Sequence, residues 1–330
     1  MNVAILDADI CVFRATAAVQ KEVIDWGDGV LTVPDDASEE TIETAVGLVE
    51  QWRDMAACSE VALAFSGARA ANFRYRILPS YKSNRVAKDR PRLYWMVEEA
   101  LKERFPHYCI DGLEGDDILG ILGTTPKWMR RGAVMVTEDK DLKGVPGLHL
   151  NPAKDSFVRE VSPSEADHFW LKQTLMGDTT DGYKGLPKCG PVKAEKVLGG
   201  HMMVAGEKWR RVVSAYQAAG LTEAHALQQA RVARILRRGD YDKQTKTIRL
   251  WHPTTPELIP LLENHGTATD ASEKHKGDTH CPSTTAQRIP LLTPPGDRAS
   301  PGADLTSRSS PSPVGQPSGA SGGPTARPAS

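Results

Sequence analysis

Residues 133–141 read Ala-Val-Met-Val-Thr-Glu-Asp-Lys-Asp, a short apolar run that ends in a cluster of acids. Comparable apolar runs occur at Val3–Leu6, Val61–Phe65 and Leu148–Leu150. Runs of this length are typical of strands that are buried on both faces of a sheet. Helical patterns separate them, at about 39–57, 91–104 and 116–122. Strands that alternate with helices predict an α/β fold built on a parallel sheet with crossover helices.

The second half of the chain shows only helical patterns from Ser164 onward. We therefore expect a helical region over residues 164–258, which follows an α/β domain over residues 1–163. The expected helices cover Ser164–Met176, Pro191–Leu198, Trp209–Ala219 and Thr222–Arg237.

The end of the chain has a different composition. Pro, Gly, Ser and Thr fill 33 of the 60 positions from Ala271 to Ser330, and no Phe, Trp or Tyr follows Trp251. Such a segment cannot bury enough apolar surface to offset the entropy that it loses on ordering. We expect residues 259–330 to form a disordered tail.

The charges of the 330 residues nearly cancel, with 41 Lys and Arg against 42 Asp and Glu. This balance excludes a polycation of the histone class but is compatible with a basic face. No apolar run approaches the ~18 residues of a membrane-spanning helix. Asp7 and Asp9 stand where the apolar part of a secretion signal would lie. We expect a soluble cytoplasmic protein whose five cysteines, none in a Cys-x-x-Cys motif, stay reduced.

Acids stand at the ends of several expected strands and at helix starts. One acid at such a position is often a helix cap, but acids from four segments that meet at one sheet edge repel one another unless cations neutralise them. Oxygen ligands without His or Cys favour Mg²⁺ or Mn²⁺, and two such ions about 3.5–4 Å apart suit phosphodiester hydrolysis. The acids are Asp7, Glu114, Asp116, Asp117, Asp139, Asp141, Asp178 and Asp181.

Basic residues are concentrated in three stretches. Between Arg69 and Arg92 there are eight Lys or Arg and a single acid, and between Lys184 and Arg211 there are seven basic residues and two acids. The stretch from Arg231 to Arg249 again has seven basic residues and two acids. One such stretch is usually a solvated face. Three of them around an acidic site favour a polyanion such as a nucleic acid as the partner.

A glycine-rich segment, Gly-Leu-Pro-Lys-Cys-Gly-Pro-Val-Lys-Ala-Glu-Lys at 185–196, adds a phosphate-binding device. Gly185 and Gly190 permit a tight turn, and Pro191 suits the first turn of a helix. The free N–H groups of that helix start, with Lys193 and Lys196 nearby, would bind a DNA backbone without reading bases.

Taken together, these motifs resemble the 5′-nuclease (flap endonuclease) superfamily, and among its members the 5′→3′ exonucleases of short-tailed phages. The resemblance covers about residues 1–255. It rests on the motifs above together with Tyr81-Lys-Ser-Asn-Arg85, Met176-Gly-Asp-Thr-Thr-Asp181 and Ile248-Arg-Leu-Trp-His-Pro253.

This resemblance implies a nuclease-type (PIN-like) sheet, a helical arch at about 80–105 and a helix–three-turn–helix region that binds duplex DNA. It implies that Asp7, Glu114 and Asp116 are ligands mainly of a first metal ion. Asp116 would also act in catalysis. The matching ligands of the second ion are Asp139, Asp141, Asp178 and Asp181, with Asp117 between the groups. Lys82 and Arg85 would contact the scissile phosphate, and Arg14 matches a basic residue after the first Asp. The implied DNA contacts are Lys82, Arg85, Lys184, Gly185, Lys188, Gly190, Lys193 and Lys196.

One position departs from the family pattern. The family has an Asp just after the second strand, where this chain reads Phe65-Ser66-Gly67-Ala68, and no carboxylate lies between Glu60 and Asp89. We expect that a water completes the first metal's shell or that metal binding is weaker there. Adding an acid, as Ser66→Asp rather than Gly67→Asp, is expected to improve it.

The function implied by the resemblance is a Mg²⁺-dependent 5′→3′ exonuclease on double-stranded DNA with 5′ ends or flaps, with flap and RNA-primer removal as further activities. Two Mg²⁺ ions are expected, with Mn²⁺ as a substitute. We expect a monomer in the cytoplasm of a phage's host that acts in replication, recombination or host-DNA degradation, with replication proteins but no membrane as partners. The alternatives are a structure-specific DNA-binding protein with a degenerate site and a PIN-type endoribonuclease.

Overall fold

The computed structural model describes residues 2–19, 24–25, 31–32, 37–84, 90–200, 203–253 and 257–260. The chain divides into two units, Met1–Gln287 and Arg288–Ser330, and every element described below belongs to the first. The expected tail over residues 259–330 lies outside the described residues except for its first two positions.

The centre of the fold is a six-stranded sheet with the strand order β5-β4-β1-β6-β7-β8. All neighbouring strands are parallel except β7 and β8, which are antiparallel, so the expected parallel α/β sheet is confirmed. The strands are β1 (Val3–Asp7), β4 (Glu60–Ser66), β5 (His107–Ile110), β6 (Val134–Val136), β7 (Gly147–Leu150) and β8 (Arg159–Val161). Strands β5 and β8 were not expected, because each is short and only partly buried.

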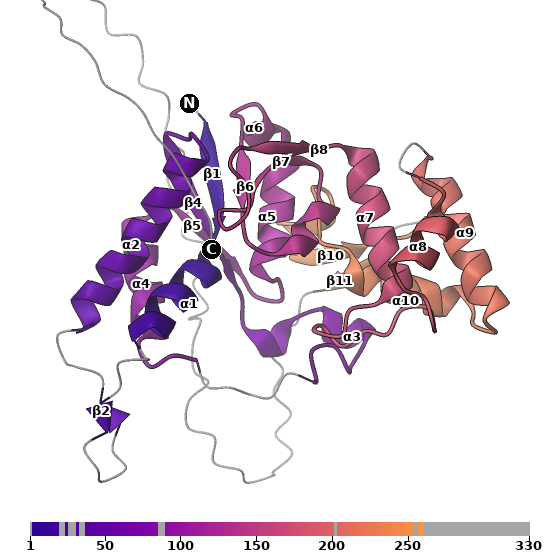
Figure 1. Cartoon of the computed structure of the whole chain (residues 1–330), viewed down its shortest axis with the longest axis horizontal. Coiled ribbons are helices and arrows are strands. Elements are labelled where there is room, and N and C mark those ends of the chain that lie inside the picture. The colour runs from indigo at the N-terminus through magenta and orange to yellow at the C-terminus, as the bar shows by residue number, and fades with distance from the viewer. Residues whose placement is uncertain are drawn as a thin grey trace, which may run out of the picture. The chain divides into compact units, whose positions relative to one another are not determined.

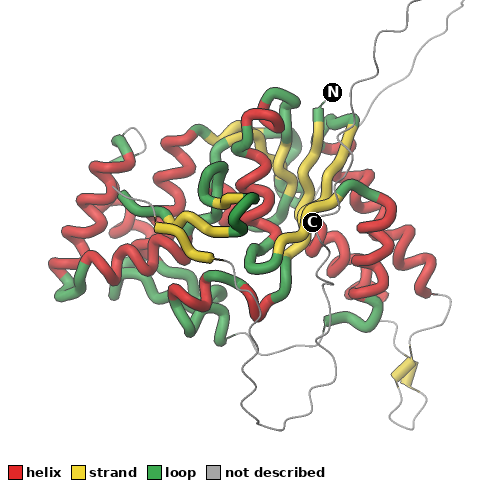
Figure 2. The backbone as a smooth tube through the Cα atoms, turned by 180° about the vertical axis from the view of Figure 1, so that it is seen from behind, coloured by secondary structure: helices red, strands yellow, loops and turns green. Residues whose placement is uncertain are grey.

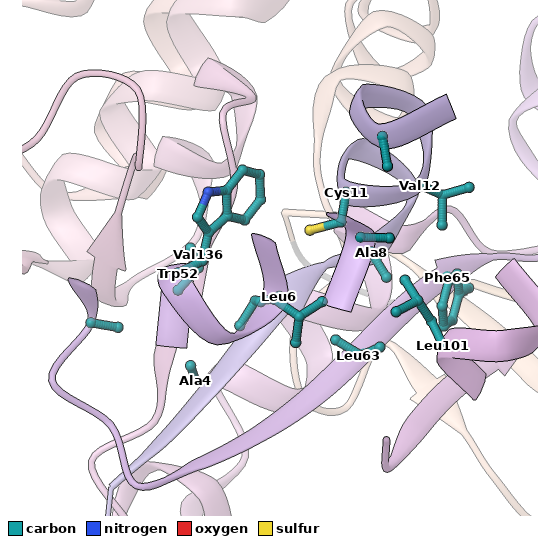
Figure 3. Close-up of a cluster of buried hydrophobic side chains, with 14 of the residues drawn as sticks. Ala4, Leu6, Ala8, Cys11, Val12, Trp52, Leu63, Phe65, Leu101 and Val136 are labelled. Carbon is teal, nitrogen blue, oxygen red and sulfur yellow. The ribbon is translucent and has the colours of Figure 1, made fainter. Parts of the chain in front are cut away.

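Helices cover both faces of this sheet (Figures 1 and 2). Because side chains alternate along a strand, Leu6 of β1 faces one layer and Ile5 faces the other. On the first face, α1 (Ala8–Val19), α2 (Ala37–Met55) and α4 (Tyr94–Arg104) pack around Leu6 and Leu63 (Figure 3). On the second face, α5 (Gly115–Gly123) packs its apolar residues against Ile5.

The helical region has its own core. Helices α7 (Pro163–Met176), α8 (Pro191–Leu198), α9 (Ala205–Ala218) and α10 (Glu223–Ala233) surround Trp170, Trp209 and Tyr216. A capping box, in which Ser162 and Glu165 bond each other's backbone N–H groups, begins α7. The expected helices are therefore present, but α10 ends at Ala233 instead of continuing to Arg237.

The expectation of helices alone after Ser164 is wrong. Strands β9 (Tyr241–Asp242), β10 (Thr247–Leu250) and β11 (Glu257–Pro260) form a small antiparallel sheet. Ile248 and Leu250 of β10 are buried in the core that α5 shares with the main sheet. Two apolar residues in a four-residue strand are too weak a pattern to identify in the sequence.

Short elements complete the described part of the chain. They are β2 (Ile24–Asp25), β3 (Leu31–Thr32), α3 (Arg74–Ile77), α6 (Pro126–Met129) and the 3₁₀ turns η2 (Arg69–Ala71) and η3 (Lys140–Gly144). Residues 85–89 of the expected arch lie outside the described residues, so the arch stays a prediction, as do the domain boundaries and the helix–three-turn–helix. None of the described helices is long and apolar enough to cross a bilayer.

Candidate active site

A pocket of about 370 Å³ opens beyond the carboxyl ends of β1, β4 and β6. In parallel sheets this edge collects the residues that follow each strand. The structure brings most of the expected metal-binding acids to this pocket, together with Lys82. Of the expected acids, Asp7, Glu114, Asp116, Asp139, Asp141 and Asp181 are in its lining.

Asp7 and Asp116 form no ion pair within the part of the chain that the structure describes. Asp7 is 7% exposed and accepts a hydrogen bond from Thr137 Oγ1 at 3.0 Å. Burial, with the charges of Asp9 and Asp139, raises the pKa of Asp7 to about 7. Burial likewise raises the pKa of Asp116 well above its usual value, and its Oδ1 has no hydrogen-bond partner among the described residues. A buried carboxylate oxygen without a partner is unfavourable, and a cation at the pocket would relieve this.

Glu114 is an acid of the pocket that contacts basic side chains. Lys82 Nζ forms an ion pair with Glu114 and lies 3.8 Å from Asp181 Oδ2, while Arg74 lies 3.4 Å from Glu114. Burial alone would raise the pKa of Glu114, but Lys82 and Arg74 hold it below its usual value. The Tyr81 hydroxyl is 3.0 Å from Glu114 and 3.1 Å from Asp181, so it can donate to one of them at a time. Glu114 therefore stays ionised at the pocket wall.

The second group of acids is joined by Lys140. Its ammonium lies 2.8 Å from Asp141 Oδ1 and 2.9 Å from Asp178 Oδ2. Asp178 lies outside the pocket lining, and its other oxygen accepts hydrogen bonds from the backbone N–H groups of Thr180 and Asp181. Asp139 caps η3 by accepting from Asp141 N at 2.8 Å. These contacts fix the loops that carry the acids.

Asp117 has a different environment from the other expected ligands. It is fully buried, and its two oxygens accept hydrogen bonds from Arg74 at 2.6 and 2.8 Å. It also accepts from the backbone N–H groups of Leu236 and Glu114. Its oxygens are therefore held by protein donors, and the residue anchors the first turn of α5. Arg74 belongs to one of the basic stretches that the sequence assigns to polyanion binding, so its burial beside Asp117 could not be seen in the sequence.

The expected basic residues are dispersed. Arg14 forms an ion pair with Glu138 at 2.6 Å, and Arg85 lies outside the described residues. In the helical region the side chains of Lys184, Lys188, Lys193 and Lys196 are exposed.

Glycines shape the turn between α7 and α8. Gly185 has a φ of +64° and lies against the backbone of Gly177, where a Cβ would collide. Gly190 is the N-cap of α8, with Pro191 in the first turn. This local geometry agrees with the tight turn expected there.

The residues after β4 carry no acid, and the structure shows why one is hard to add. The Ser66 hydroxyl accepts a hydrogen bond from Gly115 N at 2.9 Å, which holds the start of α5. A Cβ at Gly67 would collide with the carbonyl oxygen of Ile110. Asp9, which the sequence did not single out for the site, lines the pocket beside these residues.

Within the described residues, no three Asp, Glu, His or Cys side chains converge closely enough to form a complete metal cage. The acids flank the pocket instead. Mg²⁺ keeps several of its waters and needs only one or two direct carboxylates. The oxygen donor set and the unpartnered Asp116 Oδ1 fit an ion of this kind.

Comparison with known proteins agrees with this arrangement. Residues 2–151 match the family model of the 5′-3′ exonuclease N-terminal resolvase-like domain. Over these residues the chain is similar to the 5′-nuclease superfamily. It is 29% identical over 284 residues to the exodeoxyribonuclease of Enterobacteria phage T3, an alignment that covers 76% of this chain and 93% of the relative. The exonuclease of Escherichia phage T7 is also 29% identical over 284 residues, covering 76% of this chain and 94% of the relative.

A solved structure shows the same fold. The crystal structure of the bacteriophage T5 D15 protein, co-crystallized with metal ions, aligns with a TM-score of 0.50 at 13% identity. The alignment covers 71% of this chain and 90% of the T5 protein. At this identity the likeness concerns the fold alone.

Proposed function

We propose that this chain is a metal-dependent 5′→3′ exonuclease that hydrolyses phosphodiester bonds of double-stranded DNA. The proposal rests mainly on the pocket beside Lys82, where Asp7 is buried and the buried Oδ1 of Asp116 has no hydrogen-bond partner among the described residues. The relatives that align with three quarters of the chain are phage exonucleases, which agrees with this chemistry.

The acids would hold two Mg²⁺ ions, with Mn²⁺ as a substitute. Asp7, Glu114 and Asp116 would serve the first ion, and Asp139, Asp141 and Asp181 the second, with Asp178 at its edge. Bound divalent ions activate water at neutral pH and stabilise the negative charge of the leaving oxygen. The contacts of Thr137, Tyr81 and Gln173 with Asp7, Glu114 and Asp141 orient the acids for this role.

Lys82 would bind the scissile phosphate. Its backbone has a φ of +52°, and its N–H donates to the carbonyl of Asp181 at 2.8 Å. This conformation holds the ammonium between Glu114 and Asp181. A cation fixed beside the reacting phosphate stabilises the charge that grows on it during attack. Arg85 is expected to assist from the neighbouring segment.

The exposed lysines around α8 would bind the duplex. Lys184, Lys188, Lys193 and Lys196 provide positive charge, and the first turn of α8 provides free backbone N–H groups. Such contacts hold the phosphate backbone without regard to sequence. We propose that the chain works as a monomer during phage DNA replication, recombination or host-DNA degradation.

The test is a substrate panel incubated with Mg²⁺ or with EDTA. Double-stranded DNA with free 5′ ends, 5′-flap DNA, an RNA primer on DNA and single-stranded RNA would be offered in parallel. The proposal expects Mg²⁺-dependent loss of the duplex DNA from its 5′ end. Duplex binding without cleavage would favour a DNA-binding protein with a degenerate site. Cleavage of RNA alone would favour an endoribonuclease.

A further inference from the structure

Asp9 joins three segments at the wall of the pocket. It lies in the first turn of α1, two residues after Asp7. Its Oδ2 accepts a hydrogen bond from Ser66 N at 3.0 Å, at the end of β4. Its Oδ1 accepts one from the Tyr94 hydroxyl at 3.0 Å, at the start of α4. The carboxylate therefore has a fixed position beside the last residue of β4.

This is the corner of the pocket where β4 provides no acid of its own. Ser66 uses its hydroxyl to hold Gly115, and Gly67 has no room for a side chain. Asp9 Oδ2 lies near the start of α5 as well, 3.6 Å from where a Cβ on Gly115 would stand. The negative charge thus reaches this corner from α1 instead of from the end of β4.

We propose that the Asp9 carboxylate interacts with the divalent ions in the pocket. It would supply the negative charge that the residues after β4 lack. The proposal rests on the proposed function. Among the described residues, each Asp9 oxygen accepts one hydrogen bond, which leaves it a second lone pair for a cation or its water. Asp116 Oδ1, buried and unpartnered in the same lining, independently indicates that a cation belongs in this pocket.

A purely structural role for Asp9 makes a different prediction. In Asp9→Asn the amide oxygen can still accept from Ser66 N, and the amide NH₂ can donate to the Tyr94 oxygen. This variant therefore removes the charge and keeps both contacts. Tyr94→Phe does the reverse, because it removes one contact and keeps the charge. Asp54→Asn is the control, since Asp54 is an exposed acid near the end of α2.

The experiment measures Mn²⁺ binding to the full chain without DNA, by calorimetry and by the melting temperature with and without Mn²⁺. We expect Asp9→Asn to weaken Mn²⁺ binding by about tenfold or more. Tyr94→Phe removes one orienting contact but keeps the charge, so it should weaken Mn²⁺ binding clearly less than Asp9→Asn does. Asp54→Asn should bind Mn²⁺ as the unmodified chain does.

Two results would overturn the proposal. Either Asp9→Asn binds Mn²⁺ as tightly as the unmodified chain, or Tyr94→Phe loses as much affinity as Asp9→Asn, so that Asp9 only holds the segments together. Both leave the proposed function standing if the unmodified chain binds Mn²⁺ and degrades DNA. An unmodified chain that does neither would instead overturn the proposed function, and this inference with it.

Discussion

Arg74 and Asp117 form a buried, two-pronged ion pair, with nitrogen–oxygen distances of 2.6 and 2.8 Å. Arg74 is 3% exposed and also donates to the carbonyl oxygens of Val232 and Arg234, both at 3.1 Å. The pair therefore ties the first turn of α5, which carries the acids of the pocket, to the segment that follows α10. It also accounts for the early end of α10, because the residues after Ala233 extend along this pair.

Breaking this pair should destabilise the protein. Arg74→Met leaves the Asp117 carboxylate buried without its cation, which costs about 3–5 kcal/mol in comparable pairs. Urea unfolding of the unmodified chain and the variant measures this loss. Arg53→Met is the matched control, since within the described residues Arg53 forms an ion pair with the exposed Asp54 alone. A loss below about 1 kcal/mol, the range of surface pairs, would contradict the anchoring role.

Neutralising an acid of the pocket should separate cleavage from binding. Asp116→Asn or Asp139→Asn should abolish Mg²⁺-dependent cleavage and leave duplex binding unchanged or tighter, because each removes a carboxylate that repels phosphate. Cleavage assays and fluorescence anisotropy check the two effects. Normal turnover by either variant would exclude these acids from the mechanism.

The same substitution at Asp116 should raise the stability of the metal-free protein. Asp116 is crowded by the charges of Asp7 and Asp139, and its buried Oδ1 has no partner among the described residues. Asp116→Asn should therefore melt at a higher temperature in EDTA and gain less from added Mg²⁺. An unchanged melting temperature in EDTA would contradict this prediction, because the charge repulsion on Asp116 would then already be relieved in the metal-free protein.

Removing charge from α8 should weaken DNA binding without changing its sequence preference. Lys193→Ala with Lys196→Ala removes two exposed cations that would contact phosphates. The slope of log K against log salt should decrease by roughly one to two, since each phosphate contact contributes about 0.9. Lys154→Ala, at an exposed position before β8, serves as the control. An altered sequence preference with an unchanged slope would contradict this role.

His149 should make stability depend on pH. Burial lowers the pKa of His149 to about 4, and its ring lies 2.8 Å from the carbonyl oxygen of Val145, to which the neutral ring donates. The unfolded chain binds a proton at about pH 6.5 and the folded chain does not, so stability falls as the pH drops from 6.5 toward 4. The loss reaches up to about 3 kcal/mol. In urea unfolding, His149→Gln should flatten the dependence of the unfolding free energy on pH between 4 and 6.5. Parallel pH curves for the variant and the unmodified chain would show that His149 is not the cause.

The sequence predicts the parallel strands and the acids at their ends because both depend on local patterns. A buried strand such as Val134–Val136 is a continuous apolar run, and Asp139 lies three positions after its end. The role of Arg74 depends on Asp117, which lies 43 positions further along the chain, and no local pattern reveals that contact. Asp9 reaches Ser66 across 57 positions, so its place in the pocket appears only in the folded protein.

In the proposed reaction, the chain removes nucleotides from the 5′ end of duplex DNA and needs both a divalent metal and the acids of the pocket. The direct measurement is a time course on one duplex labelled either at the 5′ end or at the 3′ end, with Mg²⁺ or EDTA, for the unmodified chain and Asp116→Asn. We expect the 5′ label to be released at once in mono- or short oligonucleotides, while the 3′-labelled strand shortens progressively. This should occur only with Mg²⁺ and only with the unmodified chain. Shortening from the 3′ end, or equal activity in EDTA or in Asp116→Asn, would contradict it.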